Sequence, residues 1–427
     1  MREMKDSGVV WIGEIPSMWP TVQLGSIFSE HKHKNTGMQS NNLLSLSYGN
    51  IVRKDINTLD GLLPESFEGY NVIGPGDIVL RLTDLQNDQR SLRVGICQER
   101  GIVTSAYVTL RLRDFSMNSL FFYYLIHSYD IRKGFYGMGA GVRQGLNYAG
   151  IKKILLPVPP LAEQKLISGF LLEQETKVGK LIANVQSQIE KLKAYKQSLI
   201  TEAVTKGLDP TVPMKDSGVD WIGEIPECWN MITLGGITKE MRNGYVGPTR
   251  DLFVDNGVRY IQSLHTKDGL IDFYKHPYYV SEEWANQHPK VHTGDVLIVQ
   301  TGDIGQVALV NDKFDGSNCH ALIIASPNQT IINPEYLTYY LLSFTGKELM
   351  LSFKTGALLP HLNSGKIKST PICVPDMDTQ IRIVDYLRNK ISSIETLISV
   401  KQAKIEKLEQ YKRSLIYEYV TGKKEVS

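Results

Sequence analysis

Two long stretches of the chain carry apolar residues at the spacing of a paired helix. Residues 162–206 contain no proline, and apolar side chains recur there every seven residues; residues 384–415 repeat the pattern. A heptad pattern sustained over four or more repeats predicts a coiled coil. The expected pairing seam consists of Leu171, Val178, Ile182, Val185, Ile189, Leu192, Leu199, Leu387, Ile391, Ile394, Ile398, Ile405, Leu408 and Leu415.

Prolines mark where both helices are expected to begin. Pro159 and Pro160 precede the first stretch, and Pro371 and Pro375 precede the second. Proline near the first turn is a helix start signal. The two stretches are copies of one another, so pairing them with each other is economical, and a two-fold relation makes the pair antiparallel. The alternative is that each helix packs on its own domain.

The remaining sequence indicates mixed α+β domains. Residues 76–83 and 294–301 are apolar, β-branched runs opened by a Gly-Asp turn, which is typical of strands. Helical patterns follow at residues 120–130 and 334–343, and glycine-rich turn regions are expected at 134–145 and 346–356.

The chain is a duplication. Residues 4–19 read MKDSGVVWIGEIPSMW and residues 214–229 read MKDSGVDWIGEIPECW, with 13 of 16 positions identical. Residues 189–207 match residues 405–423 in the same way. Residues 25–140 and 235–355, between the shared blocks, have little mutual identity. A shared frame with different middles predicts one scaffold that presents two different surfaces.

These patterns predict an α+β protein with an internal pseudo-two-fold repeat. Two globular domains are expected at residues 1–150 and 209–378, separated by two long helices that pair as an antiparallel coiled coil. The helical segments are expected at residues 151–208 and 379–427.

Composition and charge narrow the function classes. The chain has 427 residues, 42% of them hydrophobic and 22% charged, which is ordinary for a globular protein. The net charge is only +2, and residues 209–378 carry 20 acidic against 13 basic groups. A protein that binds DNA mainly by neutralising phosphates would be far more basic. If this chain binds DNA, its contact is local, or a partner supplies the positive charge.

Catalytic and metal-binding motifs are missing from the sequence. It contains no phosphate-binding loop, no His-Glu-x-x-His and no Gly-x-Ser-x-Gly. His31 and His33 flank a lysine and fit a solvated loop better than a metal site, and Asp295 fits a turn cap better than a catalytic carboxylate. We therefore expect no catalytic residue and no bound metal. Four dispersed cysteines, no apolar leader and no apolar run of 18 residues lead us to expect a cytoplasmic protein without disulfides.

Three duplicated motifs resemble one family closely. They are the MKDSGV-x-WIGEIP-x-x-W block, the Pro-Leu-Ala-Glu-Gln start of a long helix at residues 160–164, and the helix end at residues 405–420. Together they are similar to the specificity subunits of Type I restriction–modification systems. The second helix start departs from the pattern, since residues 375–380 read PDMDTQ; that end of the helix is expected to dock slightly differently.

The resemblance implies a function and a set of partners. Each recognition domain would read one half of a split, asymmetric DNA site, and the paired helices would fix the spacer and dock two modification subunits. Those subunits would bind S-adenosylmethionine and methylate adenine, and restriction subunits would use ATP and Mg²⁺. This chain would bind double-stranded DNA, hold no cofactor and contact no membrane.

DNA-contacting residues are expected among polar and basic side chains at strand ends and loops. Arg81 is the strongest candidate, because a lone charge in an apolar strand is costly unless it is used. The candidates are Lys32, Lys34, Arg81, Thr83, Arg90, Arg93, Arg143 and Gln144 in the first domain, and Arg242, Gln300, Thr301, Gln306, Lys354, Thr355 and His361 in the second.

Two other interpretations remain open at this stage. One is a coiled-coil scaffold that binds proteins rather than DNA, which does not explain why duplicated frames carry different inserts. The other is the specificity part of a restriction–modification enzyme of another type.

Overall fold

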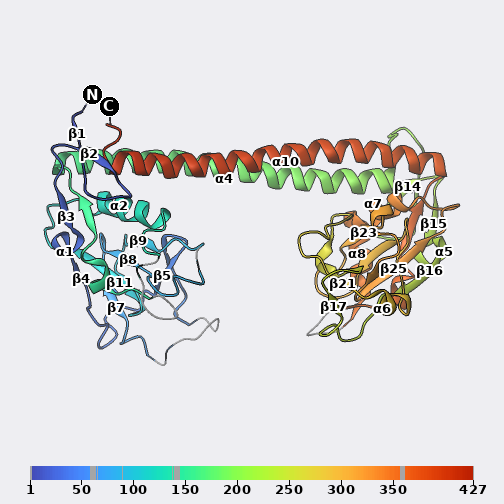
Figure 1. Cartoon of the computed structure of the whole chain (residues 1–427). Helices are drawn as coiled ribbons and strands as arrows, with labels where there is room; N and C mark the ends of the chain where they lie inside the picture. The colour runs from blue at the N-terminus through green and yellow to red at the C-terminus, as the bar shows by residue number, and fades with distance from the viewer. Residues whose placement is uncertain are drawn as a thin grey trace. The chain divides into compact units, whose positions relative to one another are not determined.

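The chain folds as two compact units with equivalent architecture. The computed structural model describes residues 2–57, 64, 66–88, 90–136, 138, 145–355 and 361–426, with Thr355 described by its backbone alone. Unit 1 consists of Met1–Val185 and Ala403–Ser427, and unit 2 of Gln186–Gln402. Each unit contains a mixed α+β domain and one part of each of the two long helices (Figure 1).

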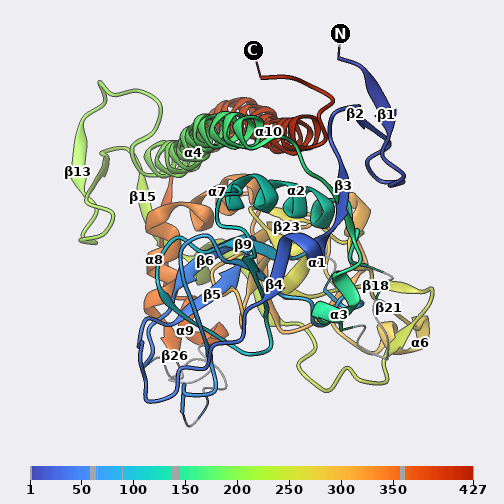
Figure 2. The same cartoon turned by 90° about the vertical axis from the view of Figure 1, so that its left-hand side faces the viewer.

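The unit 1 domain is built around a four-stranded antiparallel sheet. Its strand order is β4 (Phe28–Glu30), β11 (Val108–Leu112), β8 (Ile78–Leu80) and β9 (Val94–Ile96). Helix α2 (Ser119–Ile131) lies between this sheet and the long helices (Figure 2). Smaller pairs are β1 (Met4–Asp6) with β2 (Glu14–Pro16), β3 (Thr21–Gln23) with β12 (Leu155–Pro157), β5 (Leu44–Ser47) with β6 (Asn50–Arg53), and β7 (Asn71–Ile73) with β10 (Gly101–Val103); α1 (Leu24–Ile27) and α3 (Tyr148–Ile151) are single turns.

Unit 2 repeats this sheet. Its strand order is β16 (Thr238–Asn243), β25 (Leu322–Pro327), β22 (Val296–Val299) and β23 (Val307–Leu309), with α7 (Pro334–Leu342) in the place of α2. The frame also repeats in β13 (Met214–Asp216) with β14 (Glu224–Pro226), β15 (Asn230–Thr233) with β28 (Pro371–Val374), α5 (Leu234–Ile237) and α9 (Ser364–Ile367). The α+β fold and the duplication predicted from the sequence are confirmed.

The middle of unit 2 differs from that of unit 1. It adds a second four-stranded sheet of β17 (Phe253–Val254), β21 (Tyr279–Val280), β18 (Val258–Ile261) and β24 (Asn318–Cys319). Further elements are β19 (Thr266–Lys267), β20 (Leu270–Ile271), β26 (Lys354–Thr355), β27 (His361–Leu362), α6 (Glu282–Asn286), and the 3₁₀ turns Ser263–His265 and Asp312–Phe314.

One expectation for unit 2 is wrong. The predicted glycine-rich turn at 346–356 begins instead with helix α8 (Phe344–Ser352). The Ser343 hydroxyl accepts a hydrogen bond from the Gly346 N–H and caps this helix. A Cβ on Gly346 would lie 2.0 Å from the Tyr340 carbonyl oxygen. The glycine therefore permits a tight corner between α7 and α8 and does not end the helix.

The two long helices are α4 (Leu161–Lys206) and α10 (Met377–Val420), and they pair antiparallel within each unit. In unit 1 the Phe170 ring lies 4.7 Å from the Tyr419 ring, and Lys412 lies 3.6 Å from Glu175. Residues later in α4 therefore contact residues earlier in α10. The N-terminal part of one helix packs beside the C-terminal part of the other.

The same arrangement recurs in unit 2. The Lys401 ammonium donates to the Gln188 side chain (2.6 Å), and Lys196 pairs with Glu395 (3.2 Å). Both lysines, like Lys412 in unit 1, interrupt the apolar seam in sequence. Each finds a polar partner across the pair, which explains why these positions tolerate a charge.

The expected seam residues are buried or half-buried along both helices. The outer ones do more than pair the helices. Leu171 and Leu415 belong to the core of the unit 1 domain, and Leu199 and Leu387 to that of unit 2. Each helix pair therefore forms part of a domain core, which heptad spacing alone did not predict.

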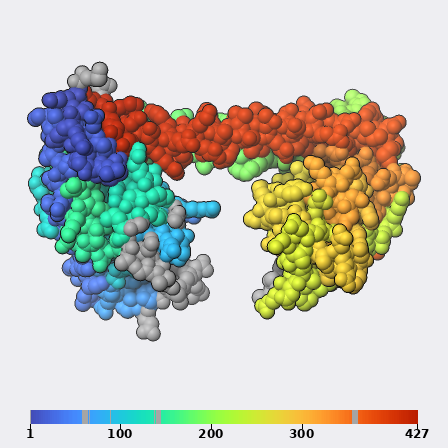
Figure 3. Space-filling view, viewed as in Figure 1, coloured from blue at the N-terminus to red at the C-terminus, as the bar shows by residue number. Residues whose placement is uncertain are grey.

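The duplicated N-terminal block packs on the end of a long helix. In unit 1, Ile15 and Trp19 are fully buried, and the Tyr417 hydroxyl of α10 donates to the Ile12 carbonyl (3.2 Å). The space-filling view shows this end of α10 against the N-terminal residues (Figure 3). In unit 2 the equivalent Trp229 is buried in the cluster that contains Leu199 of α4.

A buried glutamine secures the start of each long helix. The Gln164 side chain accepts from the backbone N–H of Asn118 (3.0 Å), the N-cap of α2, and donates to the Pro159 carbonyl (2.8 Å). Gln380 makes the equivalent contacts with Asn333 (2.7 Å) and Pro375 (2.9 Å). The departure at residues 375–380 therefore leaves this docking contact unchanged.

Candidate nucleic-acid interface

The two equivalent four-stranded sheets have the same turn before strands β8 and β22. Gly76 (φ 86°) and Gly294 (φ 91°) adopt left-handed backbone that favours glycine. The carboxylates of Asp77 and Asp295 accept from the backbone N–H three residues earlier, at 2.8 and 2.9 Å. Asp295 is thus a turn cap, as expected. Because the same turn precedes β8 and β22, the two strands are equivalent, and so are the C-terminal ends at which they leave the sheet.

Both turn aspartates also contact an arginine from another strand of the same sheet. Arg111 of β11 donates to Asp77 at 2.6 and 2.7 Å, and Arg242 of β16 lies 3.6 Å from Asp295. The Arg242 guanidinium also donates to Ser326 (3.1 Å) and to the Lys290 carbonyl (2.8 Å). Arg242, a predicted DNA contact, also joins strands of its own domain, and its side chain is 22% exposed.

Three unit 1 candidates surround the end of β8. Arg81 follows the strand directly and is half-buried, and Thr83 is exposed in the loop beyond it. Arg90, also exposed, lies in the same loop, and its backbone N–H donates to Asp88 (3.2 Å). The Ser91 hydroxyl and N–H hold the pKa of Asp88 at about 2, so its carboxylate stays ionised and structures the loop.

Arg93 differs from the other candidates, because its side chain is 0% exposed. The guanidinium donates to the carbonyls of Arg81 (3.1 Å), Thr83 (2.7 Å) and Asp84 (3.3 Å). It also donates to the carbonyl of Asp88. A side chain that lies inside the loop cannot reach a base edge, so Arg93 is removed as a direct contact.

Arg93 belongs to a buried polar group that the sequence did not reveal. Its backbone N–H donates to Asp130 of α2 (2.6 Å), and its Nε donates to the Tyr136 hydroxyl (3.0 Å). Burial raises the pKa of Asp130 to about 6, against the opposing effect of Arg93. Backbone carbonyls that accept from a buried side chain cannot be identified from the sequence. Of the groups that contact the Arg93 side chain, only the Tyr136 hydroxyl belongs to a residue type that the sequence shows as a possible hydrogen-bond partner.

The unit 2 candidates gather at the end of β22. Gln300 is half-buried, and its backbone carbonyl accepts from the Leu362 N–H (2.9 Å). Its side-chain oxygen is buried and has no hydrogen-bond partner among the residues that the structure describes. The exposed Thr301 forms a bridge with His361, and the Gln306 side chain accepts from the Asp268 N–H (3.3 Å). The structure therefore brings four predicted positions together.

The remaining candidates are more scattered. Lys32 is exposed and pairs with Glu30 (2.9 Å), and the exposed Lys34 donates to the Gly69 carbonyl (2.7 Å). Lys354 is exposed in β26, next to Thr355. Arg143 and Gln144 lie outside the described residues.

The described part of the chain offers no cluster of metal-ligating side chains. It holds no group of three or more His, Cys, Asp or Glu side chains that could bind a metal ion. His31 contacts the Val72 carbonyl instead (3.0 Å). All four cysteines are free, and no described helix has the length and apolar character to cross a membrane.

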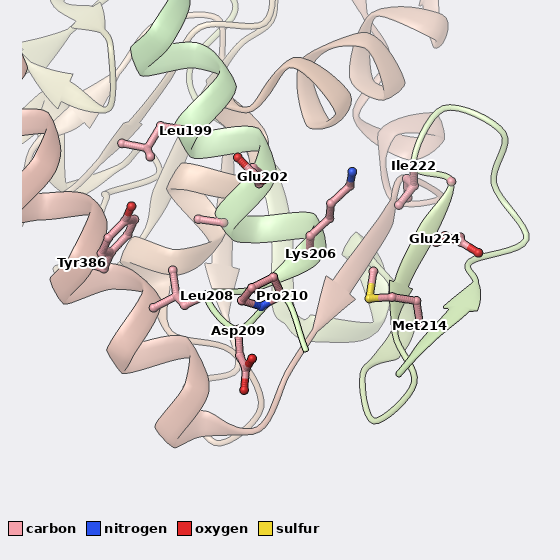
Figure 4. A pocket seen from close by; sticks show the side chains of 13 residues that line it. Leu199, Glu202, Lys206, Leu208, Asp209, Pro210, Met214, Ile222, Glu224 and Tyr386 are labelled. Carbon is pink, nitrogen blue, oxygen red and sulfur yellow. The ribbon is translucent and has the colours of Figure 1, made fainter. Parts of the chain in front are cut away.

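A pocket of about 630 Å³ in unit 2 also lacks catalytic chemistry. It lies between the end of α4 and the β13–β14 hairpin (Figure 4). Glu202, Lys206 and Glu224 stand around it among apolar side chains such as Leu199 and Met214. These groups do not converge on a common point in the view of Figure 4. Nothing in this pocket resembles an acid–base pair.

Comparisons with known proteins agree with this picture. The family described as "Type I restriction modification DNA specificity domain" matches residues 226–410. The chain is 24% identical to the Type I restriction enzyme MjaVIII specificity subunit of Methanocaldococcus jannaschii, over 96% of this chain and 93% of that protein. It is 26% identical to the EcoBI specificity subunit of Escherichia coli, over 74% of this chain and 68% of that protein.

A solved structure has the same fold. One chain from a structural study of complex assembly and conformational transition of the type I R-M system superposes with a TM-score of 0.68. The match covers 96% of this chain and 99% of that one, at 16% identity. The matched family, the full-length relatives and the duplicated α+β architecture agree. Residues 226–410 carry the Type I restriction modification DNA specificity domain, and nearly the whole chain is similar in sequence to specificity subunits of Type I restriction–modification systems.

Proposed function

We propose that the chain reads the two halves of a split, asymmetric DNA site, one half with each domain. The observation that carries this proposal is the duplicated frame with two different middles. The frame repeats strand by strand, whereas the additional sheet β17–β21–β18–β24 occurs in unit 2 alone among the described residues. Two different surfaces on one scaffold suit a site whose halves differ in sequence. The recognition domains would span residues 1–150 and 209–378.

The proposed DNA-facing groups lie at the equivalent strand ends. They are Arg81, Thr83 and Arg90 beyond β8, and Gln300, Thr301, Gln306 and His361 beyond β22. Arginine and glutamine side chains can read guanine and adenine edges in the major groove. Further candidates from the sequence are Lys32, Lys34, Arg143, Gln144, Arg242, Lys354 and Thr355.

Charge supports a division of labour between subunits. Residues 209–378 carry more acidic than basic groups, so phosphate contacts by this domain alone would be weak. Two modification subunits, docked on the paired helices of residues 151–208 and 379–427, would supply the positive clamp and bind S-adenosylmethionine. Restriction subunits, with ATP and Mg²⁺, would join the same complex.

The test combines the chain with its modification subunit. Co-expression should produce methylated adenines at one split sequence, found by sequencing methylated bases in the host genome. Expression of the modification subunit without this chain should leave those sites unmodified. The purified chain should neither methylate nor cut DNA.

Two results would contradict the proposal. One is an unchanged methylation pattern in the absence of this chain. The other is methyl transfer from S-adenosylmethionine by the isolated chain, free of partner subunits.

A further inference from the structure

The hairpins β8–β9 and β22–β23 share a register but carry different loops. Leu80 pairs with Val94 in unit 1, and Ile298 pairs with Val307 in unit 2. The next backbone hydrogen bond is also equivalent, since it ends on the Arg93 carbonyl in one unit and on the Gln306 carbonyl in the other, both at 2.9 Å. Arg93 and Gln306 therefore occupy the same place in the duplicated frame.

In the β8–β9 loop, the described residues 81–88 and 90–93 fold around the Arg93 guanidinium. Four loop carbonyls accept from its two terminal nitrogens, and the Tyr136 hydroxyl accepts from its Nε. The Tyr136 hydroxyl donates in turn to the Asp88 carbonyl (3.2 Å), and the Asp88 carboxylate lies 3.9 Å from Arg93. This buried cation is stabilised by acceptors that belong almost entirely to one loop.

The buried Arg93 guanidinium favours one conformation of the loop. A buried charge is costly unless it is fully hydrogen-bonded, so any other path of the loop would leave the guanidinium without acceptors. Asp84 adopts a left-handed backbone (φ 57°) at the turn, and its side chain accepts from Asn87 (2.7 Å). Thr83 and Arg90 of this loop are exposed.

Unit 2 holds its shorter loop by other means. Gly302 (φ 86°) and Gly305 (φ 87°) supply the turn between Thr301 and Gln306, and no arginine lies inside it. The two hairpins thus carry different loops at equivalent points of the frame. The buried Arg93 fixes one loop, and two glycines shape the other.

We propose that Arg93 is a positioning residue for DNA recognition, which holds the β8–β9 loop so that Thr83 and Arg90 meet the bases of the first half-site. This inference rests on the proposed function. Arg93 itself touches no base. It acts through the conformation of the loop, and its loss should weaken discrimination at one half-site only.

The experiment uses the full chain in complex with the modification subunit. The substrates are DNA duplexes with every single-base change in either half-site, and methylation of each is quantified by sequencing. A single mismatch typically weakens recognition about 5- to 150-fold. Tyr136→Phe removes the hydroxyl that joins Arg93 to Asp88, and Arg93→Met removes the cation. Both should reduce first half-site discrimination to below about threefold and leave the second half-site unchanged.

Three further variants separate positioning from general stability. Arg93→Lys retains the charge with fewer donors and should give intermediate discrimination. Arg90→Ala should weaken first half-site preference directly. Tyr124→Phe is the matched control, because it removes a tyrosine hydroxyl bonded to Glu175 (2.9 Å) in the same unit but away from the loop. It should keep both half-sites.

The outcomes are distinguishable. Wild-type discrimination by Tyr136→Phe and Arg93→Met would overturn the positioning role, as would an equal loss in Tyr124→Phe. If Arg93→Met fails to assemble, Tyr136→Phe decides. If the wild-type complex ignores both half-sites, the proposed function itself fails.

Discussion

At the scale of single residues, the glutamine at the start of each long helix joins that helix to its domain. Gln164 is 2% exposed and satisfies a backbone donor and a backbone acceptor at once. Gln164→Ala would leave both groups buried without a partner, at a cost of about 2–4 kcal/mol. We expect faster hydrogen exchange at the first turn of α2, measured by mass spectrometry.

Gln186 provides the control for this prediction. It is an exposed glutamine of the same helix, and its replacement by alanine should leave exchange at α2 unchanged. Gln380→Ala should have the same effect on α7 that Gln164→Ala has on α2. Unchanged protection of α2 in Gln164→Ala would show that the contact does not stabilise the domain.

A second residue-scale prediction concerns pH. Burial, with smaller contributions from Lys412 and Arg413, lowers the pKa of His127 to about 4. The unfolded chain therefore binds a proton between about pH 6.5 and 4 that the folded chain rejects, so unit 1 loses stability as pH falls through this window. Between pH 7 and pH 5 the loss amounts to about 2 kcal/mol.

His127→Gln should remove this pH dependence. The opposing contribution of Asp130, whose pKa is raised, is present in both proteins and cancels in the comparison. Hydrogen exchange at α2, measured for both proteins at pH 7 and pH 5 after correction for intrinsic rates, gives the difference. Parallel pH profiles for the two proteins would rule out His127 as the source.

At the scale of elements, the long helices differ from a free coiled coil because their ends lie in domain cores. Leu171 is 1% exposed and packs in the unit 1 core, whereas its neighbour Leu172 is 49% exposed. Leu171→Ala should destabilise unit 1 by about 2–5 kcal/mol through lost burial and a cavity. Leu172→Ala should change the stability by less than about 0.5 kcal/mol.

Thermal unfolding of the two variants checks this prediction. Both substitutions remove the same atoms from adjacent positions of α4. The two variants therefore differ only in whether the lost side chain was buried or exposed. Equal melting temperatures for Leu171→Ala and Leu172→Ala would mean that the helix does not contribute to the domain core.

At the scale of the whole molecule, the duplicated frame predicts that the two domains act independently. Replacing residues 25–140 by the corresponding segment of another family member should change one half-site and leave the other intact. The frame residues outside this segment, including Trp19 and Gln164, are retained so that the new segment meets the same contacts. Methylated-base sequencing of cells with the exchanged chain measures the result. A change in both half-sites would contradict independent reading.

The helices are also proposed to set the spacer. Four residues inserted after Val185 and four after Gln402 would lengthen both helices by about 6 Å, close to one turn, so the apolar faces stay aligned. Since one base-pair step is about 3.4 Å, the spacer should grow by one or two base pairs with unchanged half-sites. Insertion in α4 alone, the control, should shift the pairing and impair methylation. Full methylation activity at the original spacer length would show that the helices do not set the spacer.

Much of the architecture was determined by the sequence alone. Heptad spacing and the helix-breaking prolines act locally, so they predicted both long helices and their starts. The repeated blocks at residues 4–19 and 214–229 predicted the duplicated frame, because identical local sequences fold alike. The Gly-Asp turns before β8 and β22 were also visible, since a left-handed glycine and a capping carboxylate lie within four residues of one another.

Only the tertiary structure decided which polar side chains face outward. Arg81, Arg93 and Arg242 were all candidates for DNA contact on sequence, yet Arg93 lies inside a loop and Arg242 bridges strands. Arg93 donates to carbonyls of its own loop, and Arg242 donates to Ser326, 84 positions away. The glycine at position 346 likewise fits a turn in sequence but serves a helix corner against Tyr340. Long-range hydrogen bonds and close packing depend on the completed fold, and local pattern carries no record of them.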